Sequence, residues 1–200
     1  MIHTQTAGDR AIAELFATDA IFHAIRLEPY FEATARRHSE IASPLLALSA
    51  RTLARKVALV HGDVSPKNIL VGPHGPVFLD AECAWFGDPA FDLAFCLNHL
   101  LLKCLWNPTA APRLIEAFES LAAAYLECVE WESPAPLEER AARLLAALLL
   151  ARVDGKSPVE YLSAADQKLV REVAVPLIGM PPRSLEEIEL LWTARLGICR

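Results

Sequence analysis

The sequence predicts an α+β fold that is mostly helical, with one small β region near its centre. Apolar residues recur at helical spacing in the first part of the chain and again after about residue 88, and short apolar runs separated by glycine and proline lie between them. The chain has 200 residues, of which 54% are hydrophobic and 22% charged, a composition that favours a globular protein with a sizeable core. We therefore expect a single domain over 1–200, with a helical lead-in (1–56), a central segment (57–95) and a helical bundle (96–200).

The lead-in is predicted to contain two helical regions. Apolar residues at helical spacing favour helices between about residues 9 and 37, and Pro29 is predicted to interrupt them near the middle. A second helical stretch is expected over about residues 42–55 and leads directly into the β region.

The central segment is predicted to hold the strands. Residues 57–60, Val-Ala-Leu-Val, form an apolar and β-branched run that is typical of a short buried strand. Two further apolar runs, 69–71 and 76–79, flank the turn Gly-Pro-His-Gly and predict a β-hairpin. Helical patterns return afterwards, and we expect helices at about 90–106, 112–131, 137–152, 164–179 and 184–196. Gly155 is interpreted as the turn that follows the third of these helices.

Charge and cysteine content exclude several classes of protein. Nineteen Lys and Arg against 25 Asp and Glu give a net charge of −6, which disfavours binding to nucleic acid or to an anionic membrane. The five cysteines form no zinc-binding pattern, and no secretory signal is visible at the start of the chain. The longest apolar run, 144–151, is far too short to span a bilayer. A cytoplasmic protein with reduced cysteines is the expectation.

Three polar residues are predicted to meet at one end of the hairpin. Asp63 and Asn68 lie in the loop that enters the hairpin, and Asp80 follows its second strand. Two nearby carboxylates repel each other unless a cation lies between them, and oxygen ligands from Asp and Asn suit Mg²⁺, which completes its shell with water and phosphate oxygens. The combination points to phosphoryl transfer.

The order of these residues carries further information. In the kinase catalytic loop, H-R-D-x-x-x-x-N, the Asp accepts the proton of the substrate hydroxyl, the Asn binds Mg²⁺, and a later Asp holds the bridging metal. This chain has His61-Gly62-Asp63, with Asn68 five residues after the aspartate and Asp80 after the next strands. The loop therefore has the kinase spacing.

Three motifs together resemble one group of small-molecule kinases. His-Gly-Asp-Val-Ser-Pro-Lys-Asn at 61–68, Phe-Leu-Asp-Ala-Glu at 78–82 and Gly-Asp-Pro-Ala-Phe-Asp-Leu-Ala at 87–94 resemble the aminoglycoside phosphotransferase and choline kinase family, which has a protein-kinase-like fold. The glycine in the His-Gly-Asp triplet, where protein kinases carry Arg, separates this family from protein kinases. The Asp80-x-Glu82 pair looks most like the methylthioribose kinase and choline kinase branches, with methylthioribose kinase as the closest.

The resemblance implies roles for individual residues. Asp63 would be the catalytic base, Asn68 and Asp80 would bind Mg²⁺ and through it ATP, and Glu82 would be an auxiliary metal ligand. The implied reaction moves the γ-phosphoryl group of ATP to a hydroxyl of a small molecule, which leaves an aminoglycoside, choline, methylthioribose, a sugar or another alcohol open as the acceptor.

Two more residues are expected to support the loop rather than to react. The resemblance implies that Asp92 accepts backbone hydrogen bonds that hold the catalytic loop. His61 is expected to pack beneath the loop and to hydrogen-bond a backbone carbonyl.

The part of a kinase that covers the nucleotide is missing from the sequence. Upstream of Asp63 the only glycines are Gly8 and Gly62, so no glycine-rich phosphate loop exists there, and the only lysine is Lys56, too close to the loop to belong to another lobe. The chain therefore resembles a C-terminal kinase lobe without its N-terminal lobe. We expect weak or no catalysis by the isolated chain and self-association through the partly apolar face that the absent lobe would cover.

Two other classes of function stay open on the sequence alone. A non-catalytic interaction module would keep the fold and the metal residues without the ATP lobe. A metal-dependent hydrolase could use His61, Asp63 and Asp80 as ligands of a transition metal, although few further histidines are close in sequence.

Overall fold

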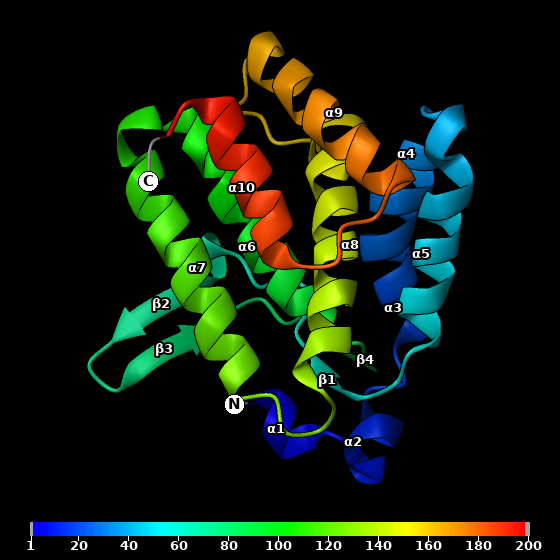
Figure 1. Ribbon diagram of the computed structural model, residues 1–200. Helices are drawn as coiled ribbons and strands as arrows, with labels where there is room; N and C mark the ends of the chain where they lie inside the picture. The colour runs from blue at the N-terminus through cyan, green and yellow to red at the C-terminus, as the bar shows by residue number, and fades with distance from the viewer. Residues whose placement is uncertain (1, 199–200) are drawn as a thin grey trace.

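A computed structural model describes residues 2–198 and confirms the α+β, mostly helical class (Figure 1). Met1, the first residue of the segment without a visible secretory signal, and Cys199 lie outside the described residues. The helical segments are α1 (Ile2–Thr6), α2 (Arg10–Leu15), α3 (Asp19–Phe22), the π-helical η1 (His23–Glu32), α4 (Ala33–Ala35), α5 (Ala42–Ala54), α6 (Ala90–Trp106), α7 (Ala111–Glu127), α8 (Pro134–Asp154), α9 (Ala164–Gly179) and α10 (Leu185–Leu196), with short 3₁₀ turns η2 (Ser39–Ile41), η3 (Pro66–Asn68) and η4 (Pro108–Ala110). The strands are β1 (Ala58–Val60), β2 (Ile69–Gly72), β3 (Gly75–Phe78) and β4 (Trp85–Gly87).

Helix α6 is the centre of the core. Fourteen of its 17 residues are buried, which is typical of a helix surrounded by protein on all sides. Helices α7 and α8 pack directly against it, and α9 and α10 pack against α8 (Figure 1). Within the described part of the chain, no helix is both long and apolar enough to cross a membrane.

The strands form two separate antiparallel pairs. Strands β2 and β3 pair from Ile69 with Phe78 to Gly72 with Gly75, which confirms the predicted hairpin, and the hairpin projects from the helical body (Figure 1). The predicted strand at 57–60 is also confirmed as β1, but its partner is β4, which the sequence did not indicate. All three residues of β4 are buried, and a strand this short shows no alternation that could reveal it.

The predicted interruption at Pro29 is wrong. Pro29 lies inside η1, whose wider π-helical turns continue into α4 without a break. The lead-in is interrupted earlier, between α2 and α3, where the backbone bonds to the β4 region instead of continuing a helix. The Phe16 carbonyl accepts from the amide of Phe86, and the Thr18 hydroxyl donates to the Ala84 carbonyl at 2.6 Å.

The later helices match their predictions with shifted ends. The helix expected at 112–131 ends at Glu127, and the one expected at 137–152 begins three residues earlier and runs to Asp154. Gly155 follows this helix as predicted, and its amide donates to the Ala151 carbonyl. The described cysteines are all free, and Cys128 alone among them is exposed.

Gly155 also permits a close contact between α8 and the lead-in. A Cβ atom at this position would lie 2.4 Å from the Ala151 carbonyl oxygen and 2.8 Å from that of Pro29. The same Pro29 carbonyl accepts a hydrogen bond from the Lys156 amide at 2.8 Å. The backbone of η1 therefore rests on the end of α8 where only glycine fits.

Substitution Gly155→Ala should lower the free energy of unfolding by about 1–3 kcal/mol, because the added methyl group meets backbone atoms that cannot move aside. Gly179→Ala is the matched control: its Cβ would meet nothing within 4 Å, so stability should stay the same or rise by up to about 1 kcal/mol. Urea denaturation followed by circular dichroism measures both. Equal midpoints for the two variants would show that the contact carries no strain.

Candidate active site

The loop that carries the kinase-like motif is fixed to α6 by one carboxylate. Asp92 accepts hydrogen bonds from the amides of His61 and Gly62, both at 2.8 Å. Asp92 is itself buried, so these two amide hydrogen bonds replace the water that would otherwise solvate its carboxylate. The start of the loop therefore follows the position of the central helix.

The other side of Asp92 is held from the N-terminus of the chain. The ring nitrogen Nε2 of His3 lies 3.1 Å from Asp92 Oδ2, and Nδ1 lies 2.7 Å from the hydroxyl of Tyr125. Burial raises the pKa of Tyr125, so its hydroxyl keeps its proton and donates to the Pro89 carbonyl at 3.3 Å. Helices α1, α6 and α7 thus meet at the carboxylate that positions the loop.

Gly62 allows the sharp turn into Asp63. Its φ is +77°, in the left-handed region that favours glycine, and a Cβ atom would lie 3.0 Å from both the carbonyl oxygen and the sulfur of Cys83. Burial raises the pKa of the Cys83 thiol to about 11, so this sulfur is a packing group beneath the loop.

Asp63 is buried and paired with a cation that the sequence did not point to. A guanidinium nitrogen of Arg26 lies 3.1 Å from Asp63 Oδ2, and Arg26 Nε donates to the Gly62 carbonyl at 2.5 Å. Both side chains are about 10% exposed, so the pair is shielded from solvent. Lys67 lies 3.8 Å from the same carboxylate oxygen, but its side chain is largely exposed.

His61 lies under the loop, as expected, but bonds a different group. Its Nδ1 accepts from the Asp63 amide at 3.2 Å, whereas a carbonyl partner was predicted. The turn at Gly62 brings the amide of Asp63 back over the ring, which explains the difference. The ring lies 5.9 Å from that of Phe78, and its buried Nε2 has no hydrogen-bond partner among residues 2–198.

Asn68 connects the loop to the hairpin. Its Nδ2 donates to the Asp63 carbonyl at 3.0 Å, so the side-chain oxygen Oδ1 takes no part in this hydrogen bond. The Asn68 carbonyl accepts from the amide of Leu79 at 2.9 Å. Asp80 is therefore one residue beyond a direct backbone bond to Asn68, at the open end of the hairpin.

Asp80 and Glu82 are exposed on the turn between β3 and β4. Asp80 has φ of 64°, the one positive φ of a residue other than glycine in the described part of the chain. No hydrogen bond ties Glu82 to Asn68 or Asp80. Among residues 2–198, no three His, Cys, Asp or Glu side chains are grouped so that they could hold a metal ion, so Asp63, Asp80 and Glu82 do not form such a cluster.

The structure brings some of the predicted residues together and leaves others apart. Asp63, Asn68, His61 and Asp92 share one hydrogen-bonded loop, and Asp80 adjoins it through the hairpin. Two cavities lie elsewhere, one between α5 and α8 and one among α7, α8 and α10, and none of the predicted site residues lines either of them. Asp63 and Asn68 are buried, whereas Asp80 at the hairpin end is exposed.

Arg26 is the site residue that sequence reasoning missed. The available signal was a charged residue between Ile25 and Leu27 in an otherwise apolar helical pattern, which indicates a buried cation in need of a partner. Its partner could not be identified from spacing, because Asp63 is far away in sequence.

Comparison with protein families identifies the family of the chain. No curated protein matches the chain. The model of the APH family, described as the phosphotransferase enzyme family, matches residues 5–137 and so runs from the end of α1 to the start of α8, including the whole loop and hairpin. Because that match spans more than half of its length, the chain belongs to the phosphotransferase enzyme family.

Proposed function

We propose that the protein is the helical lobe of an ATP-dependent small-molecule kinase, which moves the γ-phosphoryl group of ATP to a hydroxyl group. The observation that carries the proposal is the loop itself: Asp63 and Asn68 are joined by a hydrogen bond, and Asp80 lies next to Asn68 across the hairpin. Membership of the phosphotransferase family supports the reaction class. The Asp80-x-Glu82 pair resembles the methylthioribose kinase branch most closely. We therefore propose that the acceptor is a small molecule with an alcohol group, as in that branch.

Asp63 is proposed to orient the acceptor hydroxyl and take its proton. The ion pair with Arg26 engages Oδ2 and holds the carboxylate in one orientation, which leaves Oδ1 to meet the hydroxyl. Phosphoryl transfer through a loose transition state requires mainly positioning and charge stabilisation. The buried pair therefore suits this chemistry.

The donor set around Asn68 fits Mg²⁺. Asn68 Oδ1 is left over after the amide nitrogen bonds the loop, and the exposed Asp80 follows the residue that bonds the Asn68 backbone, so an amide oxygen and a carboxylate come from neighbouring points of the hairpin end. Glu82 is proposed as an auxiliary ligand on the strength of the family resemblance. A bound Mg²⁺ would neutralise the phosphate oxygens of ATP.

A non-catalytic module is the second candidate, because none of the predicted site residues lines the cavity between α5 and α8 or the one among α7, α8 and α10. Magnesium-dependent nucleotide affinity distinguishes the two. The three-ligand site that a hydrolase on His61, Asp63 and Asp80 would require is not present among residues 2–198.

Calorimetric titration with ATP tests the proposal. With Mg²⁺ the affinity should be at least about tenfold higher than with EDTA, because the cation links the protein to the phosphates. Asn68→Ala should abolish that gain, whereas Asp63→Asn, which changes the proposed base and not a proposed metal ligand, should keep it. Affinity that does not respond to Mg²⁺ in the unaltered chain would favour the non-catalytic module.

Substitution Asp80→Gly should separate the metal role from folding. Glycine adopts φ of 64° without penalty, so the free energy of unfolding should stay the same or rise by up to about 1 kcal/mol. The Mg²⁺-dependent gain in ATP affinity should disappear with the carboxylate. Urea denaturation and the ATP titration are run on the same preparation. A stable variant that keeps the Mg²⁺-dependent gain in ATP affinity would show that Asp80 does not bind the metal.

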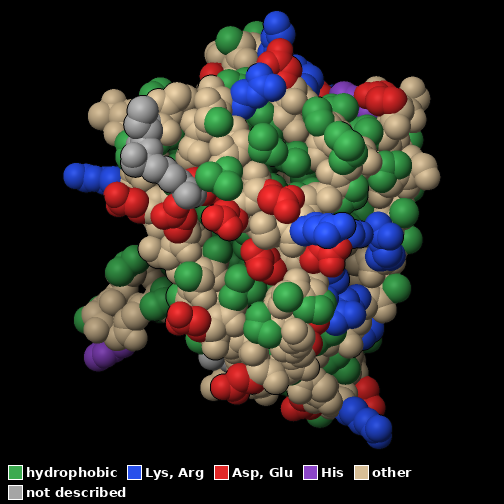
Figure 2. Space-filling view, viewed as in Figure 1, with side chains coloured by type: hydrophobic (Ala, Val, Ile, Leu, Met, Phe, Trp, Pro, Cys, Tyr) green, Lys and Arg blue, Asp and Glu red, His purple; other side chains and the backbone are tan. Residues whose placement is uncertain are grey.

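The hairpin is proposed as the surface for self-association. Its strands expose large apolar side chains on a projecting element, and the green patches on the arm at the left of Figure 2 belong to it. Val71 is 91% exposed and Leu70, Val77 and Phe78 are also exposed. A second copy of the chain would cover these side chains, since apolar edge strands readily pair with one another.

Sedimentation velocity tests this surface. The unaltered chain should form dimers as its concentration rises, and Val71→Lys should remain monomeric, because a charge would have to be buried at the contact. Leu15→Lys is the control, since Leu15 is also an exposed apolar residue but lies on α2. A monomer at high concentration, or equal effects of the two substitutions, would contradict the proposal.

A further inference from the structure

A cavity between α5 and α8 is lined by four arginines. It has a volume of about 520 Å³, and none of the loop residues 61–68 contributes to it. Figure 2 shows Lys and Arg side chains gathering where these two helices lie side by side. We call it the arginine cavity, after Arg51, Arg55, Arg140 and Arg143.

Helical spacing places these arginines together. Arg51 is in the last turn of α5, and Arg55, four residues later, caps the same helix. Arg140 and Arg143 are three residues apart on α8. Residues at these spacings share one helix face, so each helix presents two guanidinium groups to the same space, and like charges this close repel unless anions lie among them.

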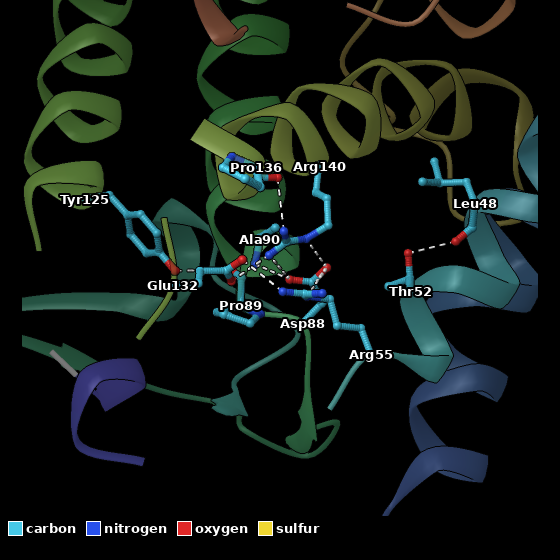
Figure 3. A network of polar contacts seen from close by, with 10 residues as sticks. All are labelled: Leu48, Thr52, Arg55, Asp88, Pro89, Ala90, Tyr125, Glu132, Pro136 and Arg140. Carbon is cyan, nitrogen blue, oxygen red and sulfur yellow. Dashed lines mark hydrogen bonds and ion pairs between the residues drawn. The ribbon is translucent and has the colours of Figure 1, made fainter. Parts of the chain in front are cut away.

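Two carboxylates hold half of this set in place. Arg140 donates to both oxygens of Asp88, at 2.8 and 3.2 Å, and to Glu132 at 2.7 Å. The other oxygen of Glu132 accepts from Arg55 at 2.9 Å. Figure 3 shows these four side chains pointing toward one another. The network fixes Arg55 and Arg140 as rigid walls of the cavity.

Several donors remain without an acceptor. The Nε atoms of Arg55 and Arg143 are buried and have no hydrogen-bond partner among residues 2–198; that of Arg55 lies 3.8 Å from Asp88, too far for a hydrogen bond. Arg143 is paired with Glu139, one turn away on its own helix. Arg51 is exposed and makes no hydrogen bond or ion pair within the described part of the chain. These Nε atoms are closed off from the cavity, so an anion there would bind terminal guanidinium nitrogens, and those of the exposed Arg51 are free to bind it.

The charge balance also favours an anion. Four guanidinium groups meet three carboxylates, those of Asp88, Glu132 and Glu139, which leaves one excess positive charge in a chain whose net charge is −6. Leu48 and Leu144 give the cavity an apolar wall. The volume is in the range of small-molecule sites.

We propose that the arginine cavity binds a small organic anion, with a phosphate or carboxylate head on the arginines and an apolar body against the leucines. Guanidinium groups bind both heads through paired hydrogen bonds. The site is separate from the catalytic loop, so the proposal is independent of the kinase activity.

Titration calorimetry in EDTA, with phenyl phosphate as the probe, tests the site. Binding should be saturable and at least about fivefold tighter than that of inorganic phosphate, because the ring buries apolar surface. Benzoate in a parallel titration identifies the preferred head. Arg51→Gln with Arg143→Gln should weaken binding of the preferred probe at least about tenfold, since two charged hydrogen-bond donors are lost.

Matched controls make the result specific. Arg10→Gln with Arg113→Gln removes the same charge from exposed positions outside the cavity and should leave the affinity within about twofold. If the cavity double variant does not fold, Arg51→Gln alone, at an exposed position, should still weaken binding at least about threefold. Absence of saturable binding of both aromatic probes, or equal losses in the cavity and control variants, would overturn the proposal.

Discussion

The arrangement of the whole site depends on one buried carboxylate. Asp92 lies on the central helix α6, and a charge there is tolerated only because the amides of His61 and Gly62 and the ring of His3 surround it. Those amides are the first two of the loop 61–68, so the same two hydrogen bonds fix the start of the loop and stabilise the buried charge of Asp92. Any change that loosens α6 from α1 or α7 would therefore reach the loop through this carboxylate.

The ion pair of Arg26 and Asp63 adds a second link, from the lead-in. Arg26 bonds the loop at two points, and its guanidinium lies 5.5 Å from the ring of Phe95 on α6. Breaking this pair would leave a buried charge without its partner, which costs far more than an exposed pair contributes. The lead-in helices are therefore part of the site and do more than pack against it.

Sequence patterns predicted the elements that depend on local spacing. They failed for features that are determined by contacts between segments far apart in the sequence. The hairpin followed from the Gly-Pro-His-Gly turn, and the long helices after residue 88 from their apolar period. Strand β4 and the uninterrupted helix through Pro29 were not predictable, because tertiary hydrogen bonds and a π-helical turn determine them. The loop spacing identified Asp63 and Asn68, but Arg26 reaches Asp63 across 37 residues, and no local pattern encodes that pairing.

The hairpin and the candidate metal residues are mechanically coupled. The hydrogen bond from Leu79 to Asn68 closes the open end of the hairpin, and Asp80, in a left-handed conformation, follows directly. A contact that covers the apolar strands would restrict the same backbone that sets the separation of Asn68 and Asp80. Since a magnesium site requires near-ideal geometry, such a contact would favour or disfavour metal binding according to which separation it selects. The proposed association at the hairpin and the proposed nucleotide binding at its base are therefore expected to depend on each other, and linkage makes the dependence reciprocal.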